Sequence, residues 1–350
     1  MSPEFVASTS EKLTYEDIAR LDPLEIDDIM AYLPLLNRDA DTVSIHNAIL
    51  YALEKSKNID QKADAIAALR DVDFLVSSLL RHGVQPLDAI IGLESEMIRL
   101  GAIAGTVPRG TVFTYAAVNP DGERNRSFTG TEEEGAFINA VREGVIALDS
   151  SVVSIGASSL KNDLDLGLAL QEASVAMDTM IDSIVQVRRT VSPEFFSNEM
   201  RPYFDSLVID GKKLTGSGGA QMQLLALDRV LWGAQEDDPD YMTFFNENLQ
   251  YLTPMQQQAL QNYLGINNNQ TILDWLTENP SQYPDMREGA ISLLKKIKKF
   301  RYPHRKVAQD NFKIRPDTAV GSGSYKPDIL DILITKTESA MRRIEESQYA

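Results

Sequence analysis

The feature that most constrains the fold is a long hydrophobic seam in the middle of the chain. Its apolar residues recur at alternating intervals of four and three over about six helical turns. They are Leu166, Leu170, Ala173, Met177, Met180, Ile184 and Val187. Because this spacing keeps every member on one side of an α-helix, the segment predicts a long helix packed against other helices. A stripe of Met and Leu is typical of core packing, so we assign it to a bundle core rather than to a cofactor site.

Helical periodicity before this seam predicts a separate N-terminal domain. Residues 11–100 show several shorter amphipathic helices, interrupted at Asp22-Pro23, at residues 37–41 and at His82-Gly83. Between residues 101 and 130 the pattern changes to Gly, Thr, Val, Pro and Asn, which predicts a domain boundary or a long crossing loop.

Helices return from Phe137 and end with a last helix through Glu346. We therefore predict an all-α fold in which a smaller N-terminal helical domain, residues 1–110, packs on a larger helical domain, residues 111–350.

Composition limits the chemistry and the partners. The net charge of -17 argues against nucleic acid and anionic membrane as main partners, because both would need a broad basic surface. The chain has no cysteine, which excludes disulfides, thiolate zinc sites, iron–sulfur clusters and thiolate-ligated haem. No apolar run approaches the roughly 20 residues that span a bilayer. We expect a cytoplasmic protein, and the sequence leaves open whether it is a monomer or a homodimer.

Residues 295–306, KKIKKFRYPHRK, contrast with this acidity, since they hold seven Lys or Arg and no acid. On a helix, His304 falls on the apolar stripe that contains Leu293, Ile297, Phe300 and Val307. The outward residues would be Lys295, Lys296, Lys298 and Lys299. An imidazole in this position is either an axial metal ligand beside cations that pair with an anionic cofactor, or a core histidine under a solvated lysine face. Pro303 indicates that a new helix starts here or that a kink is tolerated.

Other candidate sites are weaker on their own. Arg201 stands among aromatic residues in FFSNEMRPYF, where it can grip a carboxylate or pair with a helix acid. Two glycine-rich segments, residues 216–220 and 321–324, could each bring the backbone close to a ligand or act as a lid hinge, or they could form ordinary turns. His46 and His82 lack ligand spacing and are expected to be structural or exposed. The phosphate-loop, HExxH, GxSxG and GxGxxG motifs are absent.

The order of four segments resembles the indoleamine 2,3-dioxygenase superfamily of histidine-ligated haem proteins. The segments are FFSNEMRPYFDS, GSGGAQMQLLALDRVLWG, LLKKIKKFRYPHRKV and the GSGS loop before the last helix. The resemblance covers roughly residues 130–345. The N-terminal segments RLDPL and LPLLN are more similar to the branch that contains monodechloroaminopyrrolnitrin synthase, which rearranges a tryptophan-derived indole into an arylpyrrole.

This resemblance implies a role for several residues. His304 matches the proximal haem ligand, Arg301 an arginine near the haem propionates, and Asp228 an aspartate that supports the proximal side. Arg201 matches the arginine that binds the substrate carboxylate. Phe196 matches the aromatic residue packed on the indole, although Phe195 fits that position equally well.

The glycine-rich segments also acquire roles through the resemblance. The first, which includes Ser217, Gly218 and Gly219, would line the pocket. The second, Gly321, Ser322, Gly323 and Ser324, resembles a mobile loop that closes over the substrate. On the distal helix, Ala140 aligns best with the serine of the dioxygenases.

The resemblance implies a haem enzyme that acts on a small aromatic substrate. The cofactor would be haem b, with dioxygen or peroxide as co-substrate. The substrate would be tryptophan or a related indole or aromatic amino acid, and the reaction an oxygenation or an oxidative rearrangement. The alternative is a non-catalytic protein of the same fold that binds haem or another ligand. A third possibility is a helical interaction protein without a cofactor, in which the lysine face is the docking surface.

Overall fold

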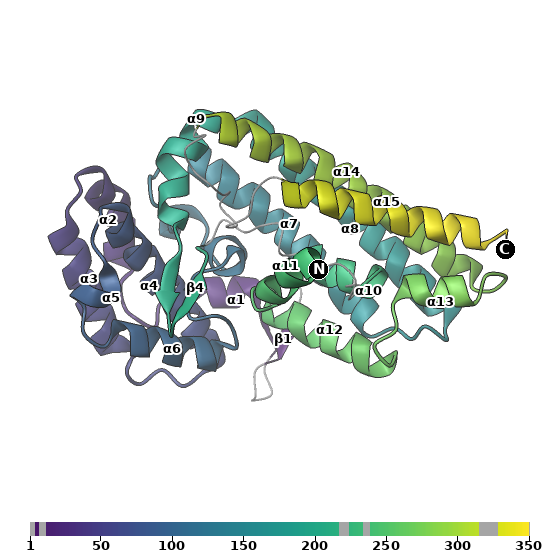
Figure 1. Cartoon of the computed structure of the whole chain (residues 1–350). Helices are drawn as coiled ribbons and strands as arrows, with labels where there is room; N and C mark the ends of the chain where they lie inside the picture. Colours follow the sequence, from purple (N-terminus) through teal and green to yellow (C-terminus); the bar gives the residue numbers. More distant parts are fainter. Residues whose placement is uncertain (1–3, 7–11, 217–223, 234–238, 315–327, 350) are drawn as a thin grey trace. The chain divides into compact units, whose positions relative to one another are not determined.

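The computed structural model (Figure 1) describes residues 4–6, 12–216, 224–233, 239–314 and 328–349. The predicted pocket residues Ser217, Gly218 and Gly219 lie outside this range, as does the predicted loop of residues 321–324.

Helices form almost all of the described structure, which confirms the predicted all-α class. The α-helices before residue 130 are α1 (Tyr15–Arg20), α2 (Asp27–Arg38), α3 (Thr42–Ser56), α4 (Lys62–Arg81), α5 (Pro86–Ala89) and α6 (Leu93–Ala104). The later ones are α7 (Glu132–Gly156), α8 (Asp163–Thr190), α9 (Pro193–Phe195), α10 (Leu225–Leu231), α11 (Pro239–Leu249), α12 (Pro254–Ile266), α13 (Ile272–Glu278), α14 (Pro284–Ile314) and α15 (Asp328–Ser347). None of the described helices is both long enough and apolar enough to cross a membrane.

Shorter elements complete the chain. Two of them are π-helices, η1 (Phe113–Ala117) and η3 (Phe196–Met200), and two are 3-10 turns, η2 (Gly122–Arg124) and η4 (Arg201–Phe204). The described strands form two antiparallel hairpins, β1 (Glu4–Val6) with β2 (Lys12–Thr14), and β3 (Leu207–Ile209) with β4 (Lys212–Leu214). In these hairpins Phe5 pairs with Leu13 and Val208 pairs with Lys213.

The predicted interruptions between the first helices are confirmed, and side-chain hydrogen bonds stabilise two of them. The carboxylate of Asp22 accepts the backbone N–H of Ile26 at 3.0 Å and of Asp27 at 3.1 Å, which holds the turn before α2. Asp41 accepts the N–H of Ser44 at 3.0 Å and caps α3. These bonds satisfy N–H groups that a helix start leaves without a partner.

The chain divides into two compact units, and each is built from separate segments. Unit 1 comprises Met1–Arg142, Val187–Ala220 and Asp310–Ser324. Unit 2 comprises Glu143–Gln186, Gln221–Gln309 and Tyr325–Ala350. Three helices, α7, α8 and α14, therefore begin in one unit and end in the other.

Unit 1 is organised around α4, which packs against α1, α3, α6, η1 and η4. Nearly every residue from Ala63 to Leu79 is buried, including the charged pair Arg70 and Asp71. Arg126 joins this pair, since its Nε donates to Asp71 Oδ1 at 3.0 Å. A helix buried on all sides needs such pairing, because an isolated buried charge is costly.

Residue 110, where the predicted N-terminal domain ends, falls inside the first segment of unit 1. The chain that follows residue 110 is buried, since every residue of η1 is buried. Arg109 is also fully buried; its Nε lies 3.3 Å from Asp73 Oδ1, and its Nη2 donates to the carbonyl of Asp205 at 2.9 Å. Glycine, threonine and proline therefore mark a buried irregular segment here. A domain that ends at residue 110 stays a prediction.

Unit 2 is a bundle built on the hydrophobic seam. Every seam residue on α8 is buried, which confirms its assignment to the core. Helix α8 crosses α14 closely at two glycines, where a Cβ on Gly289 would lie 2.8 Å from Leu170 Cβ and 3.0 Å from the carbonyl oxygen of Gly167. Figure 1 shows α14 and α15 side by side, and Arg287 Nη1 links them by donating to the carbonyl of Ile344 at 2.7 Å.

We predict that Gly289→Ala destabilises the protein although alanine favours helix more than glycine does. The gain in helix propensity is about 1 kcal/mol, whereas the added methyl group overpacks the crossing, which typically costs about 1–3 kcal/mol. Urea unfolding should show a net loss for Gly289→Ala. The matched control is Gly265→Ala on α12, where nothing lies within 4 Å of the added Cβ. A stabilising Gly289→Ala would contradict this account of the crossing.

Candidate functional site

His304 lies on α14, which runs without a break from Pro284 to Ile314. The alternative that a new helix starts at Pro303 is therefore wrong, and the proline is accommodated inside the helix. Leu293, Ile297 and Phe300 are buried as predicted, and the ring of His304 packs against Phe300 with 5.5 Å between ring centroids.

The environment of His304 keeps its imidazole neutral. The side chain is half-buried, yet its Nδ1 atom is inaccessible and has no hydrogen-bond partner in the described part of the chain. Burial, followed by the nearby charge of Arg301, lowers the pKa of His304 to about 4. A neutral ring with an uncommitted nitrogen can coordinate a metal without first losing a proton.

Arg301 lies three residues before His304, just under one helical turn, and belongs to a buried network. It is inaccessible and forms an ion pair with Asp228 of α10. Its Nη1 donates to the hydroxyl of Thr337 and, at 3.3 Å, to the carbonyl of Leu333, both on α15. The guanidinium thus connects three helices. Its placement beside a haem propionate stays a prediction, because in this structure these N–H groups are bonded within the protein.

Asp228 is held from one side only. Its Oδ2 binds Arg301, while its buried Oδ1 accepts no hydrogen bond from the residues that the structure describes. Burial raises the pKa of Asp228, and both Arg301 and the nearby Trp232 oppose that rise. Trp232 Nε1 is itself buried without a hydrogen bond among the described residues, although it lies close enough to affect this carboxyl group. The sequence prediction named Asp228 but missed Trp232, whose conspicuous aromatic side chain in ALDRVLWG was an available signal.

These residues fit a haem held by one histidine. His304 offers a neutral imidazole that no described residue engages through Nδ1, and a neutral histidine ring is the ligand that many haem proteins provide to iron. The described residues contain no group of three or more His, Asp or Glu that would hold a bare metal ion.

Arg201 and the aromatic residues of its segment lie in unit 1. Arg201 is half-buried and opens the turn η4, directly after the π-helix η3. Such short π-helical segments occur frequently at functional sites. The hydroxyl of Ser197, inside η3, donates to the carbonyl of Asn311 at 3.2 Å and so ties this segment to the end of α14.

The structure separates Phe196 from Phe195. Phe196 joins a cluster of rings, with centroids 5.6 Å from Phe137 and 6.4 Å from Phe204. Phe195 has no ring contact within the described residues. Ala140, one turn beyond Phe137 on α7, is buried. The roles of Arg201, Phe196 and Phe195 toward a substrate remain predictions.

Gly216 is the one residue of the first glycine-rich segment that the structure describes. A Cβ at this position would lie 2.8 Å from the carbonyl oxygen of Phe204. Glycine is thus required by close approach to η4, just after Arg201.

A buried glutamate that sequence reasoning missed anchors this region. Glu134 is fully buried, and its carboxylate accepts hydrogen bonds from a tyrosine, a serine, a threonine and two backbone N–H groups. The donors are Tyr115 Oη (3.0 Å), Ser127 Oγ (2.6 Å), Thr129 Oγ1 (2.7 Å), Phe128 N (2.9 Å) and Thr129 N (2.7 Å). Burial and Glu134 together raise the pKa of Tyr115 well above its usual value.

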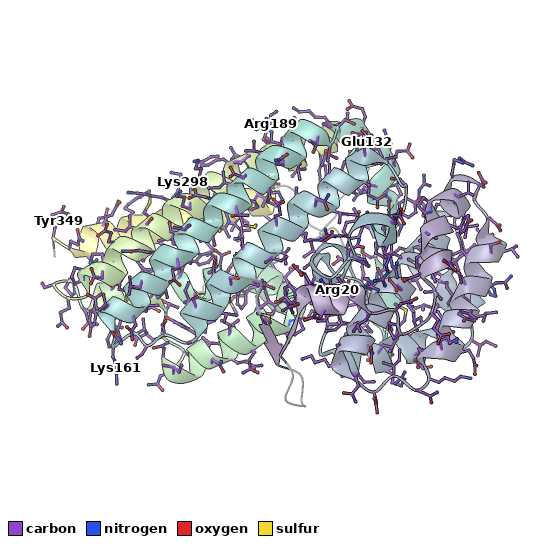
Figure 2. The ribbon with its side chains drawn as sticks, turned by 180° about the vertical axis from the view of Figure 1, so that it is seen from behind. Arg20, Glu132, Lys161, Arg189, Lys298 and Tyr349 are labelled. Atoms are coloured by element: carbon purple, nitrogen blue, oxygen red, sulfur yellow. The ribbon has the colours of Figure 1, made fainter. Side chains whose placement is uncertain are left out.

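Through Tyr115 this network reaches the aromatic cluster. The ring of Tyr115 meets that of Phe204 edge-on at 5.4 Å, and Phe204 in turn contacts Phe196. The run Glu132 to Glu134 looks like a solvated helix start, and Figure 2 shows Glu132 at the surface. The available signal was Thr131 three residues before Glu134, a capping spacing that the bond from Glu134 N to Thr131 Oγ1 confirms.

The chain is mostly helical, and a neutral, partly buried imidazole lies next to a buried arginine–aspartate pair. This arrangement is suited to hold a ligand through histidine. The chain belongs to the monodechloroaminopyrrolnitrin synthase PrnB family, whose model matches residues 21–348. The predicted resemblance is therefore confirmed.

The chain is also similar to a curated fungal protein, the 6-hydroxytryptophan 2,3-dioxygenase fscD of Fusarium equiseti. The two are 23% identical over 196 residues. This match covers 49% of the present chain and 47% of the fungal protein, so it spans about half the length of each.

We predict that Glu134→Gln destabilises unit 1 strongly. The amide would turn an N–H₂ group toward donors that now point at a carboxylate oxygen, and a buried polar group left without its partner costs about 1–3 kcal/mol. Because several donors are affected, we expect a loss at or above the upper end of that range in urea unfolding. Glu132→Gln, at the exposed start of the same helix, is the control and should unfold as the parent does. Equal stability of the two variants would show that the network is not required.

Proposed function

We propose that the protein is a haem-dependent oxygenase or oxidative rearrangement enzyme that acts on tryptophan or a related indole or aromatic amino acid. The observation that carries the proposal is His304. It is a neutral imidazole whose buried Nδ1 has no hydrogen-bond partner in the described part of the chain, and it lies on a helix fixed by a buried ion pair. Membership of the PrnB family supports it, as does the similarity to a 6-hydroxytryptophan 2,3-dioxygenase.

On this proposal His304 would hold haem b through its imidazole, and Asp228 and Arg301 would support His304. When bound, the haem supplies the activation of dioxygen or peroxide. Because the pKa of His304 is lowered to about 4, its ring is unprotonated at neutral pH and ready to bind iron. Arg301 fixes the rotation of α14 about its axis through Asp228 and α15, and thereby the direction in which His304 points.

Arg201 would position the substrate. A guanidinium binds a carboxylate through two parallel hydrogen bonds, which fixes both the place and the orientation of an amino acid. Phe196 would offer its ring to the indole, backed by Phe137 and Phe204. The chain has no cysteine thiolate, so reactivity would depend on an electron-rich ring held in place.

We expect His304→Ala to lose haem binding. Titration of the apoprotein with haem should give a strong Soret band for the parent and at least about tenfold weaker binding for the variant, equivalent to about 1.4 kcal/mol. Added imidazole should restore part of the band by occupying the vacated position. His46→Ala is the control, since His46 lies on α3 in unit 1. An unchanged Soret band in His304→Ala would refute the axial assignment.

For Arg201, we expect a loss that depends on the substrate carboxylate. Arg201→Ala should weaken tryptophan binding roughly tenfold to hundredfold, because charge-assisted hydrogen bonds contribute about 1.5–3 kcal/mol. Tryptamine, which lacks the carboxylate, should bind the variant and the parent alike. The spectral shift of the haem-loaded protein measures both affinities.

Arg189→Ala, at the exposed end of α8 (Figure 2), controls for the loss of one positive charge. Equal losses for tryptophan and tryptamine would rule out the carboxylate role of Arg201. A haem-loaded parent that gives neither spectral change nor product with tryptophan would favour the non-catalytic alternative.

A further inference from the structure

We propose that the outer face of α14 is a docking surface for a small acidic electron-carrier protein. This face, here called the basic ridge, consists of Lys295, Lys299, Tyr302 and Lys306. The proposal rests on the proposed function in one respect, because only a redox cofactor gives an electron carrier a reason to dock.

The basic ridge is continuous and exposed. Its residues are spaced by four, three and four positions, which places them on one side of a helix over about 16 Å. All of them are exposed, and Tyr302 keeps 39% of its surface accessible. Figure 2 shows Lys298, which flanks the ridge, at the outer edge of α14.

The flanks of the ridge are neutralised, whereas its first two lysines are not. Three cations beside it form ion pairs, which are Lys296 with Asp178, Lys298 with Glu338 and Arg305 with Asp331. Within the described residues neither Lys295 nor Lys299 forms an ion pair. An acidic partner could therefore contact these lysines without first displacing an internal carboxylate.

Tyr302 gives the ridge a fixed aromatic centre. Its hydroxyl donates to Glu338 at 3.1 Å, and its ring lies under two cations, with Lys298 Nζ 5.9 Å and Arg305 Cζ 5.2 Å from the ring centroid. A tyrosine that is both exposed and held in place loses little conformational entropy on binding, and such residues are enriched among interface hot spots.

Charge favours a compact acidic protein over an extended polyanion. The chain carries a net charge of -17, so a bilayer or a nucleic acid that reaches past the ridge meets repulsion. A small protein that contacts only the ridge avoids most of this repulsion, since charges more than about 10 Å away are largely screened at 0.1 M salt. This complementarity raises the association rate more than the final affinity.

The position of the ridge suits electron delivery. The ridge and His304 lie on opposite sides of α14, about half a turn apart around its axis, so about one helix diameter of 10–12 Å separates them. One electron would pass from the reduced carrier to the ferric iron held by His304, which leaves an oxidised carrier and ferrous haem. A carrier of the [2Fe–2S] ferredoxin class has the required charge and one-electron chemistry.

The test measures binding of a purified acidic [2Fe–2S] ferredoxin to the haem-loaded protein by calorimetry. We expect ferredoxin to bind the parent with an affinity that decreases as salt is added. In the double variant Lys295→Glu/Lys299→Glu the affinity should fall about tenfold or more, because two charges that attract the acidic partner are replaced by two that repel it. Lys212→Glu/Lys213→Glu is the matched control, since β4 presents two exposed lysines in unit 1. Circular dichroism and the Soret band verify that both variants fold and hold haem.

Several results would overturn the proposal. These are failure of the parent to bind ferredoxin, equal affinity of the ridge variant, or ridge-dependent binding of phosphatidylserine vesicles or duplex DNA instead. Reduction by dithionite bypasses docking, so it should proceed equally in parent and ridge variant. If the protein binds no haem, the proposed function fails by itself, and the Soret titration reveals this independently of ferredoxin binding.

Discussion

The buried ion pair between Arg301 and Asp228 is the interaction on which the candidate cofactor site depends. It joins α14 to α10, and the other hydrogen bonds of Arg301 extend it to α15. A buried pair adds little to stability overall, but removal of one partner leaves an uncompensated charge and costs about 3–5 kcal/mol. Its main effect is geometric. His304 follows Arg301 by less than one turn, so a rotation of α14 that turned the imidazole outward would also withdraw the guanidinium from Asp228.

A second buried charge, Glu134, organises the aromatic region of unit 1 by the same principle. Its carboxylate collects the donors of residues 127–129 and of Tyr115, and it lies in the first turn of α7, where the helix dipole favours a negative charge. The rings of Tyr115, Phe204 and Phe196 then follow in contact. In both regions the hydrogen bonds of a buried acidic side chain hold particular groups at fixed positions. Hydrogen bonds are directional, whereas hydrophobic packing is not.

Periodicity was sufficient to predict the helices but not their grouping. The seam on α8, the stripe Leu293 to Phe300 and the early interruptions all follow from local spacing, and the structure confirms them. The buried segment around η1 was not predictable, because glycine, threonine and proline are as common in exposed loops as in tightly packed irregular turns. Glu134 was missed for a related reason, since burial of one glutamate in a run of three depends on donors that precede it in the chain. His304 could be named as a candidate from the sequence because a basic cluster in an acidic chain is rare. The bonds of Arg301 could not be predicted, because they involve residues far away in sequence.

The segmented composition of the two units has a consequence for biosynthesis. Unit 1 needs Met1–Arg142 together with Val187–Ala220 and the segment from Asp310, and unit 2 needs Glu143–Gln186 together with Gln221–Gln309 and the segment from Tyr325. Neither unit has all of its segments until the chain has been translated past residue 310. The usual order, in which an N-terminal domain folds first, therefore does not apply. Contacts of such long sequence separation slow folding. The nascent protein would therefore expose the apolar seam of α8 until α14, which packs against it, has been translated. Exposed apolar surface of this kind makes the nascent protein a natural client for chaperones that shield hydrophobic surface.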